Sequence, residues 1–520
     1  MTWFSDSMHS RSAGNDQGHC KEKLEMVDRV FKSEEIFAQR DIMFRNSRFV
    51  RPGAMLLFIV LSVTVFATLA SAQTNSPEQS PGAQAPATTG QNTGEPSSST
   101  EAKSPSQGPY SGDFWTRSTL TGDWGGFRNE LAAKGVTVDL SLTQVYQGVV
   151  GGGKDEVWKY GGRGDITTNV DTQKLGLWPG GFLTVEGEGN FGESVNKLTG
   201  ALVPVNTNQI FPMPSGDNLD VPNVSFMQFF SPYAGVVLGK LATITPTSGD
   251  MNEFAHGKGD AQFLNLALNM NPVFLLTVPY STLGAGLIVL PTKDPNAAIL
   301  NFMVLQANGK ANTAGFSDLH WNQLSFAGEA RVKTDFFGLT GHQLIGGVYS
   351  NKTFNNLDQN RFIVETTGIE KKSGSWDIYY NFDQYLYETK KGSGKGIGIF
   401  GRFGVSDGNP NPMHYFYSLG IGGKGVIPGR SLDQFGIGGY YIDVSNPKFT
   451  GPVLTRTFLR NEYGFEAYYN IAITPWMKFT PDIQVIRPAQ KDFVDTKGLI
   501  PVRKNVDTAT VLGIRLQLVF

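Results

Sequence analysis

Apolar and polar residues alternate along most of the chain after residue 135. The pattern is clearest at the carboxyl end, where the even-numbered residues from Leu512 to Leu518 are aliphatic and the odd-numbered residues between them are Gly, Arg and Gln. A period of two residues predicts a β-strand with two unlike faces. This strand ends the chain on a bare aromatic residue, Phe520, which is unusual in a soluble sandwich. It is typical of the closing strand of an outer-membrane barrel, which faces lipid on one side and a polar lumen on the other.

The same alternation predicts strands from Val136 to Phe520. About seventeen segments show it, and because a closed single-chain bacterial barrel has an even number of strands, we expect sixteen. The boundaries are least distinct between residues 223 and 306, where short runs are interrupted by Pro. The polar residues that we expect to line the pore are Arg163, Asp165, Glu186, Glu188, Lys240, Glu329, Arg331, Arg402, Arg460, Glu462 and Gln484.

Two of these residues, Glu186 and Glu188, form a pair of carboxylates on one face of a strand. A carboxylate turned towards lipid costs of order a few kcal/mol near the membrane midplane. We therefore expect both to project into the lumen and to favour the passage of cations.

Connections of two kinds separate the predicted strands. Ile473–Pro475 is a tight turn, whereas Arg487–Asn505 is long and polar. In barrels of this kind the short turns are periplasmic and the long loops external. The remaining long connections, at 192–222, 245–259, 351–373 and 445–456, are therefore expected to be external loops. The first of them is punctuated by Pro and is long enough to fold inward and narrow the pore.

Composition agrees with a barrel. Only 17% of the 520 residues are charged, against about 25% in soluble domains, yet the mean hydropathy is only −0.19. Alternating strands explain this combination, because their apolar and polar residues cancel in any average. A helical membrane protein is disfavoured, since only one stretch approaches the roughly 18 apolar residues that a spanning helix needs. The net charge of −2 gives no indication of nucleic-acid binding.

The one long apolar stretch has the features of a secretory signal. Arg45, Arg48 and Arg51 precede an apolar block at 54–69, and Ala70-Ser71-Ala72 follows it. A single transmembrane anchor is the alternative, which the small residues and the polar tract after them disfavour. We expect residues 1–42 to be a leader that is untranslated or unstructured, 43–72 to be the signal peptide, and translation to begin at Met43.

The mature chain is predicted to have a tail and a barrel. Residues 73–112 are rich in Pro, Ser, Thr and Gly and nearly free of large apolar residues, which is typical of a disordered linker. Residues 113–520 form the barrel and include a short amphipathic helix at 124–134, with Asp123 as its cap and Gly135 as its stop. The only cysteine, Cys20, lies in the leader, and the histidines show no metal spacing. Neither a metal nor another cofactor is expected.

Several segments resemble the carbohydrate-selective porin family of Gram-negative outer membranes. The matching motifs are Leu120-Thr-Gly-Asp-Trp-Gly-Gly-Phe-Arg128, Gly176-Leu-Trp-Pro-Gly-Gly-Phe182, Leu238-Gly-Lys-Leu241, Pro428-Gly-Arg430 with Asp433 and Phe435, Thr474-Pro-Trp476 with Thr480-Pro-Asp-Ile-Gln484, and Val511-Leu-Gly-Ile-Arg-Leu516 with Phe520. The resemblance spans nearly all of residues 115–520. It implies an all-β, sixteen-stranded transmembrane antiparallel barrel in the bacterial outer membrane, with the helix near its periplasmic mouth, that passes sugars by diffusion.

Sugar passage has chemical requirements that the sequence can meet. A neutral sugar needs hydrogen-bonding groups in place of water, and aromatic surfaces against the apolar faces of its rings. The polar lumen residues supply the bonds, and rows of opposite charge also create a transverse field that filters ions. Trp158, Tyr160, Trp178 and Trp321 are candidate stacking platforms, although an aromatic girdle at the membrane interface explains them better. Lys240 is either a pore cation or an ordinary lumen residue.

Other functions remain as alternatives. The nearest is a general or ion-selective porin without sugar preference, and a surface adhesin or secretion barrel is more remote because the linker is short and plain. A lipid-hydrolysing enzyme is disfavoured, since no predicted strand pairs a lipid-facing His with a Ser. A gated transporter is also disfavoured, because it would carry a folded plug domain, and only one short helix precedes the first predicted strand. The expected partners are sugars, outer-membrane lipid, the barrel-assembly machinery, which would read Phe520 as its signal, and a second copy of the chain.

Overall fold

The computed structural model describes residues 108–210, 219–244, 252–360, 368–450, 459–495 and 501–520. All of them belong to the compact unit that runs from Gly82 to Phe520. The predicted leader, the predicted signal and most of the predicted linker lie outside the described residues. In the part of the chain that the structure describes, no helix is long and apolar enough to cross a membrane.

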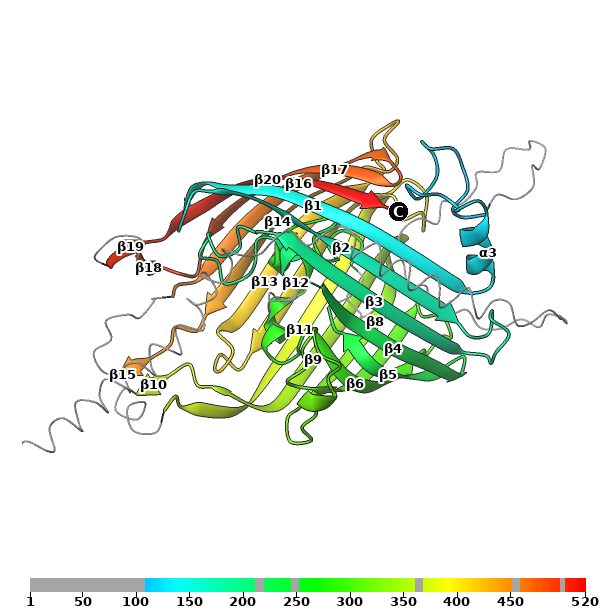
Figure 1. The fold of residues 1–520 in the computed structure, drawn as a ribbon. Coiled ribbons are helices and arrows are strands. Elements are labelled where there is room, and N and C mark those ends of the chain that lie inside the picture. Colours follow the sequence, from blue (N-terminus) through cyan, green and yellow to red (C-terminus); the bar gives the residue numbers. More distant parts are fainter. Residues whose placement is uncertain (1–107, 211–218, 245–251, 361–367, 451–458, 496–500) are drawn as a thin grey trace, which may run out of the picture. The chain divides into compact units, whose positions relative to one another are not determined.

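Sixteen antiparallel strands form one closed barrel (Figure 1). Each barrel strand pairs with the next one along the chain, and the last pairs with the first. The predicted sixteen-stranded barrel is therefore confirmed. Its strands are β1 (Val136–Gly153), β2 (Trp158–Asp171), β3 (Gly181–Gly192), β4 (Leu219–Ser231), β5 (Ala234–Ala242), β6 (Ser281–Val289), β7 (Ala298–Gln306), β8 (Leu324–Phe336), β9 (Leu339–Asn355), β11 (Lys371–Glu388), β12 (Gly396–Ser406), β13 (Met413–Lys424), β14 (Gln434–Val444), β16 (Glu462–Thr474), β17 (Met477–Arg487) and β20 (Asp507–Val519).

The remaining described elements are short. Two small sheets lie outside the barrel: β10 (Gln359–Asn360) pairs in parallel with β15 (Phe449–Thr450), and β18 (Asp492–Asp495) pairs with the antiparallel β19 (Val502–Asn505). The helices are α3 (Phe127–Ala133), α4 (Leu266–Asn269) and the 3-10 turns η2 (Thr207–Gln209), η4 (Pro272–Leu276) and η5 (Phe316–Asp318).

The two faces of each strand differ as the alternation predicts. In β16, Glu462 and Glu466 are fully buried, whereas Tyr463 and Phe465 are exposed. The buried face is polar and the exposed face is apolar, which is the reverse of a soluble sheet and the arrangement of a barrel surrounded by lipid. Exposed residues therefore mark the outer face of the wall and buried residues the inner face.

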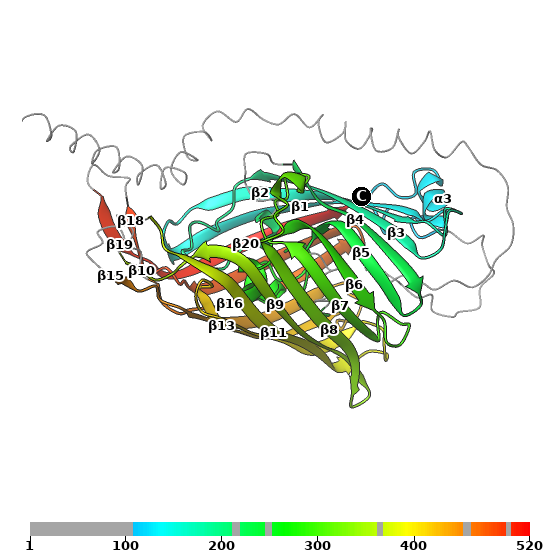
Figure 2. The same ribbon diagram turned by 90° about the horizontal axis from the view of Figure 1, so that it is seen from below.

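Connections at the two ends of the barrel differ in length. At the end that carries the carboxyl terminus, two residues join β4 to β5, β8 to β9 and β16 to β17, the last being the predicted tight turn. At the opposite end the connections include residues 193–218, 243–280 and 488–506. Figures 1 and 2 both show α3 beside the carboxyl terminus and the two small sheets at the far end. The short-turn end is the periplasmic end.

The first and last strands meet along a closure seam, which the segment before β1 covers at the periplasmic end. The Arg128 guanidinium of α3 donates to the carbonyl oxygens of Phe520 at 2.8 Å and Val138 at 2.6 Å. It also lies 4.0 Å from the ring centroid of Tyr110 and 5.0 Å from that of Trp124. Arg128 is only 1% exposed, so this guanidinium ties both strands of the seam to the helix.

Helix α3 begins later than predicted. Its first residue is Phe127, because Trp124, Gly125 and Gly126 all have positive φ angles, of 54°, 71° and 96°, which are incompatible with a right-handed helix. The predicted cap, Asp123, instead accepts a hydrogen bond from the backbone N–H of Gly125 at 3.2 Å within this turn. The helix ends at Ala133, one residue before the predicted end.

Two of the long connections fold back into the barrel. We call their described residues, 193–210 and 252–280, the insert. Its side chains pack on the inner wall: the buried ring of Phe263 lies 5.3 Å from Phe400 and 4.9 Å from Tyr468, centroid to centroid. The inward path that the Pro-punctuated loop at 192–222 suggested is present in its described part. The expectation that 245–259 is an external loop is wrong for residues 252–259, because polar groups of the wall bind their backbone.

Candidate functional site in the barrel interior

Two wall carboxylates hold the backbone of the insert. Glu462 accepts the N–H of Leu202 at 2.6 Å, and Glu466 accepts the N–H groups of Leu264 and Asn265 at 2.6 and 2.8 Å. Both glutamates are 0% exposed. An irregular segment in a barrel leaves backbone N–H groups without strand partners, and these carboxylates satisfy several of them.

Two wall arginines satisfy the carbonyl oxygens of the same segment. Arg402 donates to Leu268 at 2.9 Å and to Asn269 at 3.2 Å, while Arg515 donates to Gln262 at 2.5 Å. The short helix α4 thus has the Glu466 carboxylate at its N-terminus and the Arg402 guanidinium at its C-terminal carbonyls. Each charge opposes the local end of the helix dipole, which stabilises this orientation.

A third contact is a buried charge cluster on β2 and β3. The Lys258 ammonium of the insert forms an ion pair with Glu188, whose second carboxylate oxygen accepts the Tyr280 hydroxyl. On the adjacent strand, Arg163 pairs with Asp165 at 2.8 Å. Burial alone lowers the pKa of Lys258, but the carboxylate of Glu188 outweighs it and holds this pKa well above the ordinary value. The lysine therefore stays charged throughout the neutral range.

Gln484 completes the set of wall residues that hold the insert. Its side-chain N–H donates to the carbonyl of Val205 at 2.9 Å, and its oxygen accepts from Asn265 at 3.1 Å. The residues that the sequence predicted on the lumen side therefore do lie on the inner face of the wall in this part of the barrel. Their polar groups contact the insert or each other, however, whereas we expected them to contact water and solute. The members of this group are Arg163, Asp165, Glu188, Arg402, Glu462 and Gln484.

Glu186 and two arginines from the predicted set are not among the wall residues that bind the insert. Glu186 shares the inner face of β3 with Glu188, and its Oε2 is buried without a protein hydrogen-bond partner among the described residues. Arg331 donates to the carbonyl of Pro295, at the periplasmic turn between β6 and β7. Arg460 precedes β16 at the loop end, where it donates to Pro488 at 2.9 Å.

Lys240 does not face the lumen. Val237 and Leu241 are buried in the apolar cluster inside the barrel, so the alternation of β5 places Lys240 on the outer face. Its ammonium donates to the carbonyl oxygens of Ala311 and Thr313 at 2.6 and 2.5 Å, in the connection between β7 and β8. Such bonds replace the water that the charge would lose at this position. The prediction of a pore cation is wrong here.

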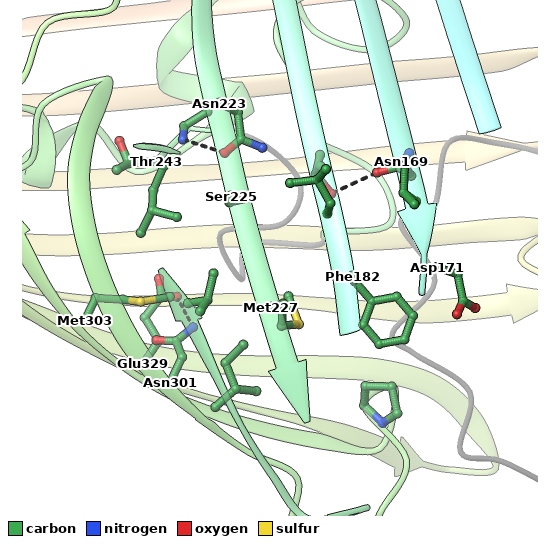
Figure 3. A pocket seen from close by; sticks show the side chains of 18 of the residues that line it. Asn169, Asp171, Phe182, Asn223, Ser225, Met227, Thr243, Asn301, Met303 and Glu329 are labelled. Atoms are coloured by element: carbon green, nitrogen blue, oxygen red, sulfur yellow. Dashed lines mark hydrogen bonds between the residues drawn. The ribbon is translucent and has the colours of Figure 1, made fainter. Parts of the chain in front are cut away.

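A cavity of about 1030 Å³ lies beside the insert, along the other side of the lumen (Figure 3). Residues at the periplasmic turns line one end of it, including Asp171, Gln173, Lys174 and Lys293–Asn296. Away from these turns, its polar lining is mostly uncharged and consists of amides and hydroxyls, with the carboxylate of Glu329. These residues are Thr137, Asn169, Thr184, Asn223, Ser225, Asn301, Glu329, Tyr379 and Asn381.

Hydrogen bonds orient the polar lining. Thr184 donates to Asn169 at 3.0 Å, and Glu329 accepts from the Asn301 amide at 3.0 Å (Figure 3). Glu329 also accepts from the Tyr379 hydroxyl at 2.6 Å. Of the pore residues predicted from the sequence, only Glu329 lines this cavity. The amides and hydroxyls were missed because short neutral side chains are equally common in solvated turns and strands.

The predicted aromatic platforms lie away from the lumen. Trp158 stacks on Tyr146 at 4.9 Å between centroids, and both are exposed, as is Tyr160. Trp178 lies in the periplasmic turn before β3, and Trp321, which is 80% exposed, lies in the connection between β7 and β8. These positions favour the membrane girdle over sugar stacking. The aromatic residues that line the cavity are instead Phe182, Phe274 and Tyr379.

Comparisons with known proteins agree with this architecture. The model of the family described as "Carbohydrate-selective porin, OprB family" matches residues 156–520. Porin B of Pseudomonas aeruginosa is 27% identical over 164 residues, which are 29% of this chain and 33% of that protein. The chain thus matches about a third of the length of this curated relative. The high-pH structure of Pseudomonas putida OprB aligns with a TM-score of 0.64 at 21% identity, over 79% of this chain and 100% of that one. This likeness shows the fold alone.

Proposed function

The chain belongs to the carbohydrate-selective porin family OprB, and on that premise we propose that it is an outer-membrane porin through which carbohydrates diffuse into the periplasm. The barrel lies in the bacterial outer membrane, where its exposed apolar face meets lipid. The activity and the substrates are proposals for this chain.

The wall of the cavity is the observation that supports carbohydrate passage. Neutral amides and hydroxyls dominate its polar side, and each can both donate to and accept from a sugar hydroxyl or water. The carboxylate of Glu329, held by Asn301 and Tyr379, adds a strong acceptor. A hydroxylated solute can therefore exchange its hydration for bonds to the wall at little net cost.

The runner-up is a general or ion-selective porin. Such a pore needs free charges along its lumen to create a transverse field. Here Arg163, Glu188, Arg402 and Glu462 are each no more than 1% exposed and are bound to the insert or to each other. Their fields are largely compensated within the protein, which favours selection by hydrogen bonding over selection by charge.

Uptake into proteoliposomes tests the proposal. Purified protein in liposomes should admit a neutral hexose faster than a hexuronate or a hexose phosphate of similar size, and protein-free liposomes should admit none of them. Equal rates for neutral and charged solutes of one size would support the general porin instead. No uptake of any neutral sugar would refute the proposed function.

Three further expectations remain proposals. The segment 43–72 is removed on export, so that amino-terminal sequencing of outer-membrane material should find Gln73 first. The barrel-assembly machinery inserts the barrel and reads Phe520. Barrels of this chain associate with one another, which light scattering in detergent can test.

A further inference from the structure

Apolar side chains form a continuous belt across the inner wall of the cavity. Strand register places Phe182 beside Met227 and Met227 beside Val237. Val237 is paired with Gly286 and Gly286 with Met303. The belt continues through Ala327 on β8 to Val348 on β9. A barrel interior is normally polar, so a belt that crosses seven neighbouring strands needs an explanation.

The glycine in the belt shows that the apolar surface is continuous. A Cβ added at Gly286 would lie 2.0 Å from the sulfur of Met303, so this thioether already covers the glycine. Methionine is flexible and polarizable and adapts its shape to irregular apolar partners. The belt is therefore an unbroken and adaptable surface.

The insert supplies the opposing apolar surface. Phe274 and Val278 line the same cavity as the belt and belong to the same apolar cluster or pack against it. Phe274 also packs against Tyr379, whose hydroxyl binds Glu329, with ring centroids 5.5 Å apart. Polar groups for a sugar and an apolar surface for another group thus line one cavity.

Packing of the insert does not account for the whole belt. Val237 and Val348 are buried in the cluster, but Met227, Met303 and Ala327 are only partly buried. Those three residues, together with Phe182, line the cavity and present apolar surface to it (Figure 3 shows Phe182, Met227 and Met303). Apolar surface left open in a cavity is typical of a binding site.

We propose that this cavity binds carbohydrates that carry an apolar substituent, such as aryl glycosides, with the substituent on the belt and the sugar hydroxyls at Asn301 and Glu329. The proposal rests on the proposed sugar-porin function. Burial of part of a phenyl ring should strengthen binding about tenfold over a methyl glycoside.

Block of ion current tests the proposal with two probes, methyl and phenyl β-glucoside, on single channels in planar bilayers. In the unmodified protein the phenyl glycoside should block at about one-tenth of the concentration of the methyl glycoside. Met227→Gln with Met303→Gln should bring the ratio close to one. Met227→Leu with Met303→Leu is the matched control, because it keeps the belt apolar and should keep the preference.

The outcomes separate the two proposals. If both glycosides block the unmodified channel equally, the belt has no ligand role, even though sugar flux still supports a porin. Loss of the preference in the Leu variant as well as the Gln variant would also overturn the proposal, because it would assign the effect to altered packing. If neither glycoside blocks and no neutral sugar enters liposomes, the proposed function fails together with this inference. Should the Gln variant not fold, the ratio in the unmodified protein still decides.

Discussion

Removal of the Glu188 charge should release the insert from the wall. In Glu188→Gln the amide can still accept the Tyr280 hydroxyl, but it cannot neutralise Lys258, whose side chain is only 10% exposed. Loss of one partner from a buried ion pair costs about 3–5 kcal/mol. We take the lower end, about 3 kcal/mol, because the lysine side chain is 10% exposed and keeps part of its hydration. That energy shifts the equilibrium towards the released insert about 100-fold.

Two measurements detect the released state. Single-channel recordings should show larger or noisier conductance, because the insert occupies part of the lumen. Limited proteolysis should cut faster within residues 252–280, while the barrel keeps its heat-modifiable migration. Both effects should be similar between about pH 5 and 9. Because the pKa of Lys258 is raised in the folded protein, its contribution to stability is present below the unfolded pKa of about 10.4 and is lost only as pH rises further.

Two variants serve as controls. Glu186→Gln removes the neighbouring carboxylate from the same face of β3 without breaking an ion pair, so it should resemble the unmodified protein. Glu188→Leu combined with Lys258→Met removes both charges and should restore a held insert, because apolar residues often replace a buried pair without loss of stability. The reasoning fails if Glu188→Gln and Glu186→Gln, both folded, have the same conductance and the same cleavage rate. Equal and large losses of cation selectivity in these two variants would instead support the selectivity role expected from the sequence.

Two substitutions and one deletion test the periplasmic end. Arg128→Ala should lower the stability of the barrel by about 2–3 kcal/mol, because it removes charged hydrogen bonds to both strands of the closure seam. We expect a lower thermal midpoint and faster proteolysis before β1. An unchanged midpoint would show that Arg128 does not stabilise the seam. Asp433 is buried, which raises its pKa, but hydrogen bonds from Arg430 and Tyr469 outweigh burial and hold the pKa below the ordinary value. The contribution of the Asp433 carboxylate to stability is therefore present above about pH 4 and is lost as pH falls further. Asp433→Asn should lower the thermal midpoint at pH 7 and have the same midpoint as the unmodified protein near pH 2. An equally lowered midpoint at both pH values would show that the charge of Asp433 is not what stabilises the turn. Deletion of Phe520 should reduce the amount of folded barrel in the outer membrane more than it alters the conductance of the channels that do form; normal surface levels would count against an assembly signal.

The sequence predicts the wall of the barrel far better than its contents. Alternation places Glu462 and Glu466 on the inner face because strand geometry is local and repeats every two residues. It cannot show that these carboxylates bind the N–H groups of Leu202 and Leu264, which lie 260 and 202 positions away. Such contacts depend on the inward path of a loop, for which the sequence carries only the weak signal of Pro and length.

Local conformation explains the other differences. The sequence alone does not show which face Lys240 occupies, because its strand is short and the connection that covers it is remote in sequence. The start of α3 was predicted three residues early because Asp123 followed by Trp124-Gly125-Gly126 fits a helix cap as well as a left-handed turn. The family resemblance identified the motif around Asp433 but did not show what the motif does. In the structure, Asp433 holds a periplasmic turn through hydrogen bonds from Arg430 and Tyr469.

The pairing of β1 with β20 determines when during its biosynthesis the protein can become a barrel. Arg128 binds the carbonyl of Phe520 across 392 positions of sequence. If only its first fifteen barrel strands were paired, the chain would be a sheet with two unpaired edges, and exposed edges readily pair with those of other chains. Contacts between such distant residues also form slowly. The barrel can therefore close only when its final strand is available, and that strand is the one that removes both open edges.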